Sequence, residues 1–188
     1  MTRAVVAALL LLAARPVLGE DVLRLDPARS AVRFTLAATL HTVRGEGRVV
    51  SGELRFAPEG GPASGAVVVD TRSFATGVAA RDRNMHEQVL ESARFPEIRF
   101  EPERLELRSR SEDAAEVVLH GHFEIHGGRH AAAVPARLAR EGDGVRVEAA
   151  FTVPYAAWGL RDVSTFVLRV APEVEVQLEL RGTLESAS

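Results

Sequence analysis

The sequence predicts an all-β fold, an extended antiparallel β-barrel of about eight strands with one amphipathic helix inserted. Three observations predict it. Apolar and polar residues alternate through most of the chain after residue 30, as they do on strands with one buried face. The longest alternating runs reach about ten residues, roughly 33 Å, which suits a tilted barrel wall better than a small sandwich. One segment, 79–93, interrupts the alternation with helical spacing.

The N-terminal half is expected to contain four strands before the helix. They are predicted at 22–26, 30–40, 46–56 and 65–71. The last of these has apolar residues on consecutive positions, so its inward face cannot be assigned from the alternation. The turn 58–62, which contains prolines and glycines, separates the third strand from the fourth.

The predicted helix is amphipathic and is expected to lie over the barrel mouth or along one flank. Its apolar side chains recur at helical spacing, at Met85, Val89, Leu90 and Ala93. The helix should end at Phe95-Pro96, because the residue before a proline avoids the helical backbone conformation.

The C-terminal half is expected to be β-structure again. Strands resume at Glu97, and the apolar parity changes across 101–103, which predicts a bulge or a tight turn there. The remaining strands are predicted at 115–125, 129–139, 144–155, 165–170 and 173–182, and a loop at 156–164 carries the single tryptophan.

Residues 1–19 have the features of a secretory signal peptide, and residues 20–188 are expected to form a single domain. Arg3 precedes an uncharged apolar run, 4–14, and the small-residue sequence that follows is suited to cleavage near Gly19. The apolar run is too short to span a bilayer, and no other stretch is expected to cross one. The mature chain is therefore expected in the periplasm or outside the cell.

The composition excludes several classes of chemistry. The chain has no cysteine, so an exported domain would have neither disulfides nor a cysteine for a lipid anchor. It also has no lysine, which excludes a lysine Schiff base and a phosphate-loop lysine. The formal net charge of −3 argues against a nucleic-acid partner. Exposed strand edges permit a homodimer without requiring one.

Four of the six histidines are close together in sequence, which raises the question of a metal site. They are His120, His122, His126 and His130. The alternation places them opposite the apolar side chains of their hairpin, so solvated surface residues are a better interpretation than metal ligands. The sequence contains no nucleophile elbow, glycine-rich phosphate loop or His-Glu-x-x-His helix. No catalytic residue, metal or cofactor is therefore expected.

The residues on the apolar faces are expected to point inward and to contact a ligand if the barrel is hollow. They are Phe34, Leu36, Leu54, Phe56, Ile98, Phe100, Phe123, Phe151, Phe166 and Leu168, with Met85 and Leu90 added from the helix. Tyr155 and Trp158 suit a half-wet rim of the barrel, and the alternative for Trp158 is that it plugs the barrel end. In a filled barrel the same side chains would form an ordinary dry core.

Several motifs, taken in chain order, resemble the YceI-like family of polyisoprenoid-binding proteins. The segment 81–86 followed by 95–100 is similar to the family's short helix and the strand after it. Residues 30–34 resemble its opening strand, 123–127 its Ile-His-Gly hairpin, and 158–160 its Trp-Gly-Leu segment. The ordered set covers nearly all of the mature chain.

The resemblance implies an extended, lipocalin-like barrel that holds a long isoprenoid chain, such as a polyprenyl or quinone tail. It also implies that Arg81, Asp82 and His86 are rim residues that contact the head group. The leading hypothesis is therefore a periplasmic carrier of an isoprenoid lipid. The alternatives are an enzyme acting on an isoprenoid or small apolar substrate, with His86 or His41 as general base, and a filled barrel that serves as an interaction module.

Overall fold

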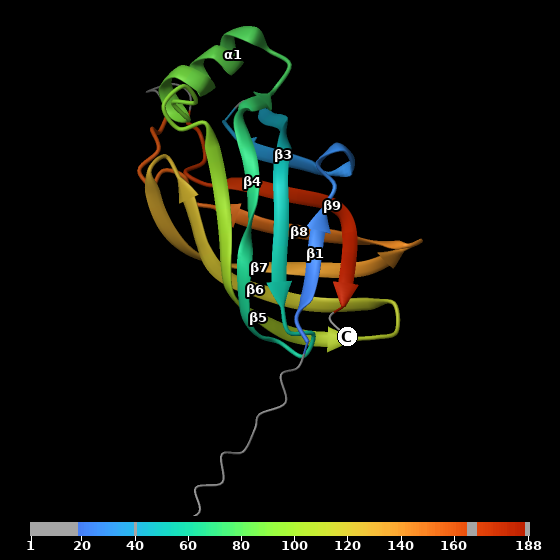
Figure 1. Cartoon of the computed structure of the whole chain (residues 1–188). Coiled ribbons are helices and arrows are strands. Elements are labelled where there is room, and N and C mark those ends of the chain that lie inside the picture. Colours follow the sequence, from blue (N-terminus) through green and yellow to red (C-terminus); the bar gives the residue numbers. More distant parts are fainter. Residues whose placement is uncertain (1–18, 40, 165–168, 187–188) are drawn as a thin grey trace, which may run out of the picture.

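A computed structural model of the protein describes residues 19–39, 41–164 and 169–186, in which one continuous antiparallel sheet closes into a barrel (Figure 1). Its strands are β1 (Asp21–Leu25), β2 (Ala31–Ala37), β3 (Thr42–Phe56), β4 (Gly61–Ala75), β5 (Glu97–Arg110), β6 (Ala114–Ile125), β7 (Gly128–Glu141), β8 (Gly144–Val153) and β9 (Val174–Ser186). The predicted all-β barrel is confirmed. The predicted signal peptide, apart from Gly19, lies outside the described residues.

The nine strands occupy eight positions around the barrel because β1 and β2 share one position. Both pair with β3 and β9, but with different halves of those strands. A single turn of 3₁₀ helix, η1 (Pro27–Arg29), separates them and offsets the chain between the two halves. The pairing of β3 with β4 closes the ring. The expected number of about eight strands is thus correct for the barrel wall.

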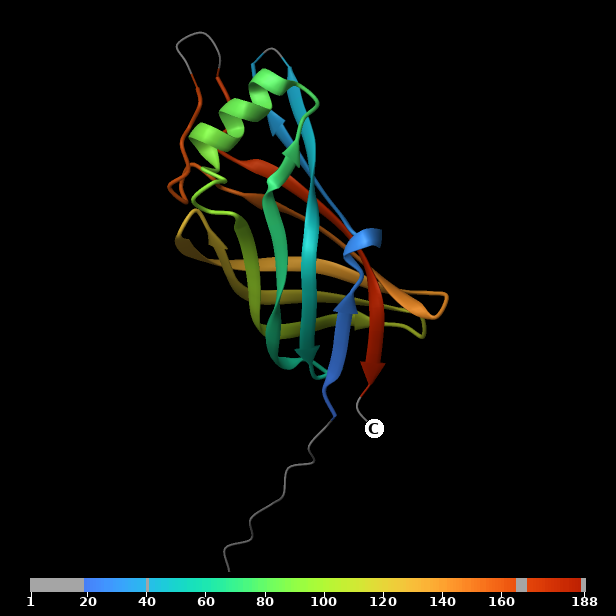
Figure 2. The ribbon, with the colours of Figure 1, turned by 45° about the horizontal axis from the view of Figure 1, so that its top comes forward.

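A short helical segment crosses one end of the barrel, at the opposite end from the C-terminus (Figures 1 and 2). It consists of α1 (Ala79–Asn84) followed by a π-helical turn, η2 (Met85–Val89), in which Leu90 N–H donates to the carbonyl of Met85 at 2.9 Å. The sequence correctly placed this helix over the barrel. The prediction that it extends to Ala93 is wrong, because Glu91 has a φ of 44° and turns the chain toward β5.

The predictions for three other segments can be compared with the observed strands. Strand β4 runs well beyond the predicted 65–71 at both ends, because its long pairing with β3 stabilises residues of weak strand propensity. The predicted bulge at 101–103 is confirmed by a register shift between Pro102 and Arg104. Most of the predicted strand 165–170 lies outside the described residues, and Val170 makes only an isolated bridge with Ala38.

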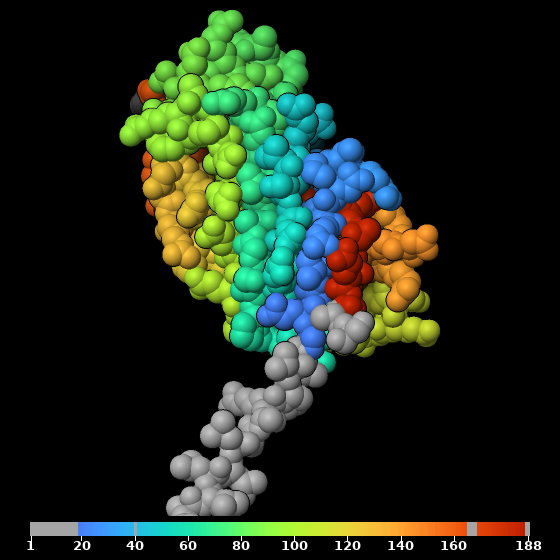
Figure 3. All heavy atoms as spheres, in the orientation of Figure 1, coloured from blue at the N-terminus to red at the C-terminus, as the bar shows by residue number. Residues whose placement is uncertain are grey.

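The barrel interior is most tightly packed at the end away from the helix. Leu23, Leu54, Phe56 and Leu105 are between 2% and 6% exposed there. Figure 3 shows that side chains on β3 and β4 close the outer wall on that face of the molecule. The barrel is therefore sealed at one end and covered by the helix at the other.

Candidate functional site

The barrel encloses an elongated apolar cavity of about 480 Å³. Inward-facing residues from every strand line it, together with Met85, Val89 and Leu90 of the helical segment. The volume falls within the roughly 300–1,000 Å³ of sites that bind small molecules. A barrel filled by its own side chains would leave no such space, which counts against the interpretation as a purely structural module.

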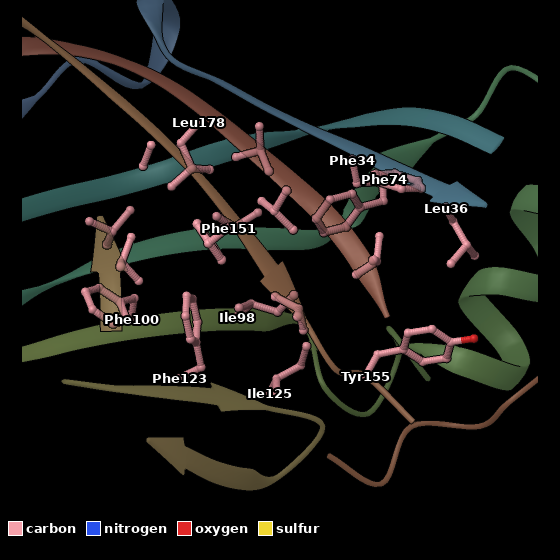
Figure 4. Close-up of a pocket in the computed structure, with 18 of the residues that line it drawn as sticks. Phe34, Leu36, Phe74, Ile98, Phe100, Phe123, Ile125, Phe151, Tyr155 and Leu178 are labelled. Atoms are coloured by element: carbon pink, nitrogen blue, oxygen red, sulfur yellow. The ribbon is translucent and has the colours of Figure 1, made fainter. Parts of the chain in front are cut away.

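Side chains that line the cavity near the helix are less buried than those at the other end. Near the sealed end the lining side chains are buried, whereas Phe34, Leu36, Phe74 and Ile98 are only half-buried although they point inward. Figure 4 shows these four side chains directed into the interior of the barrel. Two further lining residues, His41 and Asn84, are exposed to solvent and mark the mouth beside α1. The lining is thus apolar in depth and polar at the mouth.

Twelve of the fourteen residues expected to contact a ligand line this cavity. They are Phe34, Leu36, Leu54, Phe56, Met85, Leu90, Ile98, Phe100, Phe123, Phe151, Tyr155 and Trp158. The other two, Phe166 and Leu168, lie outside the described residues. The alternation of apolar residues therefore identified the inward faces, while the contact of these side chains with a ligand stays a prediction.

Paired aromatic rings shape the mid-section of the cavity. Phe34 and Phe74 meet edge to face, with ring centroids 5.6 Å apart. Their rings lie over Gly45 and Gly47, where a Cβ atom would approach Phe34 to 2.4 Å and Phe74 to 2.7 Å. The two glycines on β3 therefore make room for these rings inside the barrel.

A second aromatic row follows the opposite wall. Phe123 is central to it, with ring centroids 4.8 Å from Phe100, 5.5 Å from Phe151 and 5.8 Å from Trp158. These rings come from β5, β6, β8 and the segment after β8, so their contact depends on closure of the barrel. They present a continuous apolar surface to the cavity.

Trp158 also closes a gap in the wall. The β7–β8 ladder extends only from Ala136 and Ala149 to the connecting turn, and beyond it the two strands diverge (Figure 2). The indole of Trp158 stacks on the ring of His130, with centroids 4.6 Å apart and planes within 5°. Trp158 therefore lines the cavity and also fills the gap between β7 and β8. The sequence interpretations of Trp158, as a rim residue and as a plug, each describe part of this position.

The predicted rim residues Arg81 and Asp82 attach the helix to the end of β4. Asp82 accepts hydrogen bonds from the hydroxyl and the backbone N–H of Thr76, and Arg81 Nε donates to that hydroxyl at 2.7 Å. The hydrogen bond from the Thr76 hydroxyl holds the pKa of Asp82 below its ordinary value. Of the two residues only Arg81 lines the cavity, and head-group contact stays a prediction for both.

His86, the third predicted rim residue, is held by structural contacts. Its Nε2 lies 2.9 Å from the carbonyl oxygen of Phe74 and must donate to it, and its Nδ1 lies 2.8 Å from the hydroxyl of buried Ser92. It is not among the cavity-lining residues, so its expected contact with a head group also stays a prediction. The network instead fastens η2 to β4.

Tyr155 is the one tyrosine of the chain and lies at the helix end of the cavity. The residue is 6% exposed, and its hydroxyl has no hydrogen-bond partner among the described residues. Figure 4 shows this hydroxyl directed at the helical segment. Burial, and to a lesser extent the negative charge of Asp162, raises the pKa of the Tyr155 phenol.

The sequence pattern did not identify all of the lining. Phe74 was missed because the predicted strand ended at residue 71, whereas β4 continues to Ala75. Leu178 and Val176 line the cavity from β9, where the strict alternation of 174–180 was visible but was not converted into site residues. The orphaned hydroxyl of Tyr155 could not have been found from sequence, because it depends on what surrounds the side chain.

The clustered histidines are engaged separately. His120 bonds Glu106 at 2.8 Å, His122 lies 2.9 Å from Glu103, and His126 pairs with Glu91 at the end of the helical segment. Within the described ranges, no group of three or more His, Cys, Asp or Glu side chains could hold a metal ion. Nor does any helix there have the length and apolar character to cross a membrane.

Comparison with known families decides the classification. A family model for the YceI-like domain matches residues 23–182. The chain belongs to the YceI-like family. The match spans the barrel almost from β1 to the last strand, so the cavity lies entirely within the family domain. A search of curated protein sequences finds no match.

Solved structures of YceI-like and related proteins have the same fold. BcnA of Burkholderia cenocepacia aligns with a TM-score of 0.69 at 18% identity, covering 85% of this chain and 99% of its own. A polyisoprenoid binding domain from Saccharophagus degradans, implicated in plant cell wall breakdown, aligns at 0.62 and 14%, covering 87% and 98%. The YceI protein of Campylobacter jejuni aligns at 0.61 and 12%, covering 80% and 88%. At these identities the likeness concerns the fold alone.

Proposed function

We propose that this protein binds a long isoprenoid chain, of the polyprenyl or quinone type, in its barrel cavity and acts as a carrier. The cavity is the observation that carries the proposal. It is elongated, apolar along its depth, sealed at one end and polar at its mouth, which suits a molecule with a long apolar tail and a polar head.

Two further points support the proposal. The Saccharophagus degradans domain with this fold is described as binding polyisoprenoids. The energetics also favour a long tail, since each buried methylene contributes up to about 0.8 kcal/mol. Three or four isoprene units would therefore exceed the cost of ordering the ligand and give micromolar binding or better.

A series of alcohols of increasing length tests the proposal. Geraniol, farnesol and geranylgeraniol would be titrated against the protein by displacement of the fluorescent apolar probe N-phenyl-1-naphthylamine. Affinity should rise by roughly tenfold or more with each added isoprene unit until the cavity is filled. Equal affinities across the series, or no displacement by any alcohol, would overturn the proposal.

We also propose that the protein is a carrier and not an enzyme. Both ring nitrogens of His86 are engaged by structural partners. His41 lies at the exposed mouth of the cavity, and no carboxylate is paired with its ring among the salt bridges of the described residues. Neither histidine therefore has the oriented acid partner that a general base requires. Conversion of geranylgeraniol by the wild-type protein, lost in His41→Ala, would contradict this.

Export is part of the same proposal. The basic residue, the apolar run and the small residues before Glu20 support cleavage near Gly19 and a location in the periplasm or outside the cell. Intact mass and N-terminal sequencing of the protein from cell fractions would test this. Cytoplasmic protein that retains Met1 would contradict it.

A further inference from the structure

The hydroxyl of Tyr155 is buried and has no hydrogen-bond partner among the described residues. Its oxygen has less than 1 Å² of accessible surface, so water does not reach it, and no described residue accepts or donates a hydrogen bond there. A buried hydroxyl without a partner destabilises the folded protein, and native proteins rarely tolerate one without a reason. In the ligand-free protein, the Tyr155 ring is packed while its hydroxyl is left without a hydrogen bond.

Packing does not require that hydroxyl. The protein has eight phenylalanines and a single tyrosine, and six of those phenylalanines already line the same cavity with Tyr155. The Tyr155 ring packs among Ile125, Val153 and Leu160 in an apolar cluster. A phenylalanine would satisfy every one of these contacts without a buried polar atom.

The environment makes the hydroxyl a hydrogen-bond donor to a neutral group. Because the pKa of Tyr155 is raised by burial, the phenol keeps its proton and can donate. Arg81 is the only arginine among the described lining residues. Its Nε and Nη2 donate to Thr76, and its positive charge interacts with the neighbouring Asp82 carboxylate. A phosphate brought to this end of the cavity would therefore lose water and meet a positive charge that Asp82 already balances.

Resting on the proposed function, we infer that Tyr155 is a specificity residue whose hydroxyl donates a hydrogen bond to an uncharged oxygen acceptor, a carbonyl or an ether, on the head of the bound isoprenoid. Val89 and Leu90 of the helical segment pack against the same cluster, and the hydroxyl is directed at this segment (Figure 4). Because the oxygen is buried, a ligand head reaches it only if this end of the cavity adjusts on binding. The chemical class of the cargo is thus an isoprenoid with a neutral, oxygen-bearing head.

Matched probes separate this inference from tail binding. Farnesyl methyl ether has a hydrogen-bond acceptor but no donor and no charge. The matched hydrocarbon, with a methylene in place of the ether oxygen, has no hydrogen-bonding group. Farnesyl phosphate is anionic. Each would be tested by displacement of N-phenyl-1-naphthylamine from wild type, Tyr155→Phe and Val50→Phe. Val50 is 51% exposed, and its replacement adds a ring outside the barrel.

Wild type and Val50→Phe should prefer the ether over the hydrocarbon by about tenfold, which corresponds to about 1.4 kcal/mol. In Tyr155→Phe the two affinities should agree within about twofold, and farnesyl phosphate should bind wild type no more tightly than the ether. A wild type that does not distinguish ether from hydrocarbon, or a Tyr155→Phe that still does, would overturn the inference while leaving tail binding intact. Failure of every probe to bind would overturn the proposed function as well.

The stability of the ligand-free protein gives a second, independent test. Because Tyr155→Phe removes an unsatisfied group and keeps the ring, the variant should melt at the wild-type temperature or above it. Melting more than about 2 °C lower would show that the hydroxyl has a partner within the protein and would contradict the inference.

Discussion

Single aromatic side chains set the free volume of the cavity. Phe151 points into it and stacks on Phe123 with ring centroids 5.5 Å apart, yet is only half-buried. Replacing Phe151 by Trp should fill space that a ligand would use without disturbing the fold. Losing room for two or three methylenes corresponds to roughly 2 kcal/mol, or about a thirtyfold loss of geranylgeraniol affinity.

The matched control for Phe151→Trp is Val50→Trp, which adds the same indole to the outer face of β3. Its affinity for geranylgeraniol should equal that of wild type, and both variants should retain a β-sheet circular dichroism spectrum. If Phe151→Trp binds as tightly as Val50→Trp, the cavity at Phe151 is not the binding site.

Gly45 illustrates how a residue without a side chain positions a ring. A Cβ atom there would lie 2.4 Å from Phe34 and 2.6 Å from the backbone oxygen of Ala75. Gly45→Ala should therefore lower the free energy of unfolding by about 1–3 kcal/mol, measured by urea denaturation. Adding Phe34→Leu should recover part of that loss, because the ring contact is relieved; strictly additive losses would show that the two residues do not interact.

At the scale of elements, the helical segment is a cover held by few contacts. Asp82 and Thr76 fasten its start, His86 fastens its middle to β4, and the pair of Glu91 and His126 fastens its end. Glu91 and His126 both have positive φ, at 44° and 51°, so two backbone strains meet at this contact. The cover therefore depends on specific polar anchors at each end.

The Asp82 anchor should make stability depend on pH. Its pKa is depressed from 3.8 by the hydrogen bond from Thr76, so its stabilisation is present above the ordinary pKa and is lost as pH falls through the lower folded value. At pH 7, Asp82→Asn should be less stable than wild type by about 1 kcal/mol. The stabilities of the two proteins should converge as the pH falls below 3.8 and passes through the lower folded pKa.

A suitable control for that titration is Asp143→Asn, which alters an exposed carboxylate in the β7–β8 turn. It should follow wild type at every pH. A stability difference between wild type and Asp82→Asn that persists unchanged to pH 2 would show that the carboxylate charge is not what holds the helix.

The elements also show what sequence patterns can and cannot predict. The alternation of apolar and polar residues correctly located most strands and their inward faces, because successive side chains of every barrel strand point in turn to the interior and to solvent. It did not predict that β1 and β2 share a wall position, since that depends on pairing with distant β3 and β9. The helix end was misplaced for a related reason, as buried Ser92 and the left-handed Glu91 are fixed by contacts with neighbouring elements.

For the candidate site, the division is similar. Residue type and the alternation of apolar residues identified most of the apolar lining, whereas Phe74 required knowledge that the pairing of β4 with β3 extends past residue 71. The roles of Arg81, Asp82 and His86 depended on partners 5 to 12 residues away that no spacing rule identifies. Polar contacts are therefore the part of this site that only the folded structure supplies.

For the whole molecule, a ligand that binds only the folded barrel must stabilise it. At a ligand concentration of about 100 times Kd the gain is about 2.7 kcal/mol. For a domain of this size the melting temperature should rise by roughly 5–10 °C with geranylgeraniol. Phe151→Trp should show a much smaller rise at the same concentration, and an equal rise would indicate binding outside the cavity.

The most direct test of an isoprenoid-binding barrel is native mass spectrometry of the protein purified from its own cells, followed by organic extraction. The account predicts one lipid per chain, identified in the extract as an isoprenoid with a neutral oxygen-bearing head. It also predicts that lipid-free protein forms a one-to-one complex when excess geranylgeraniol is added. Lipid-free protein that forms no such complex would contradict the account.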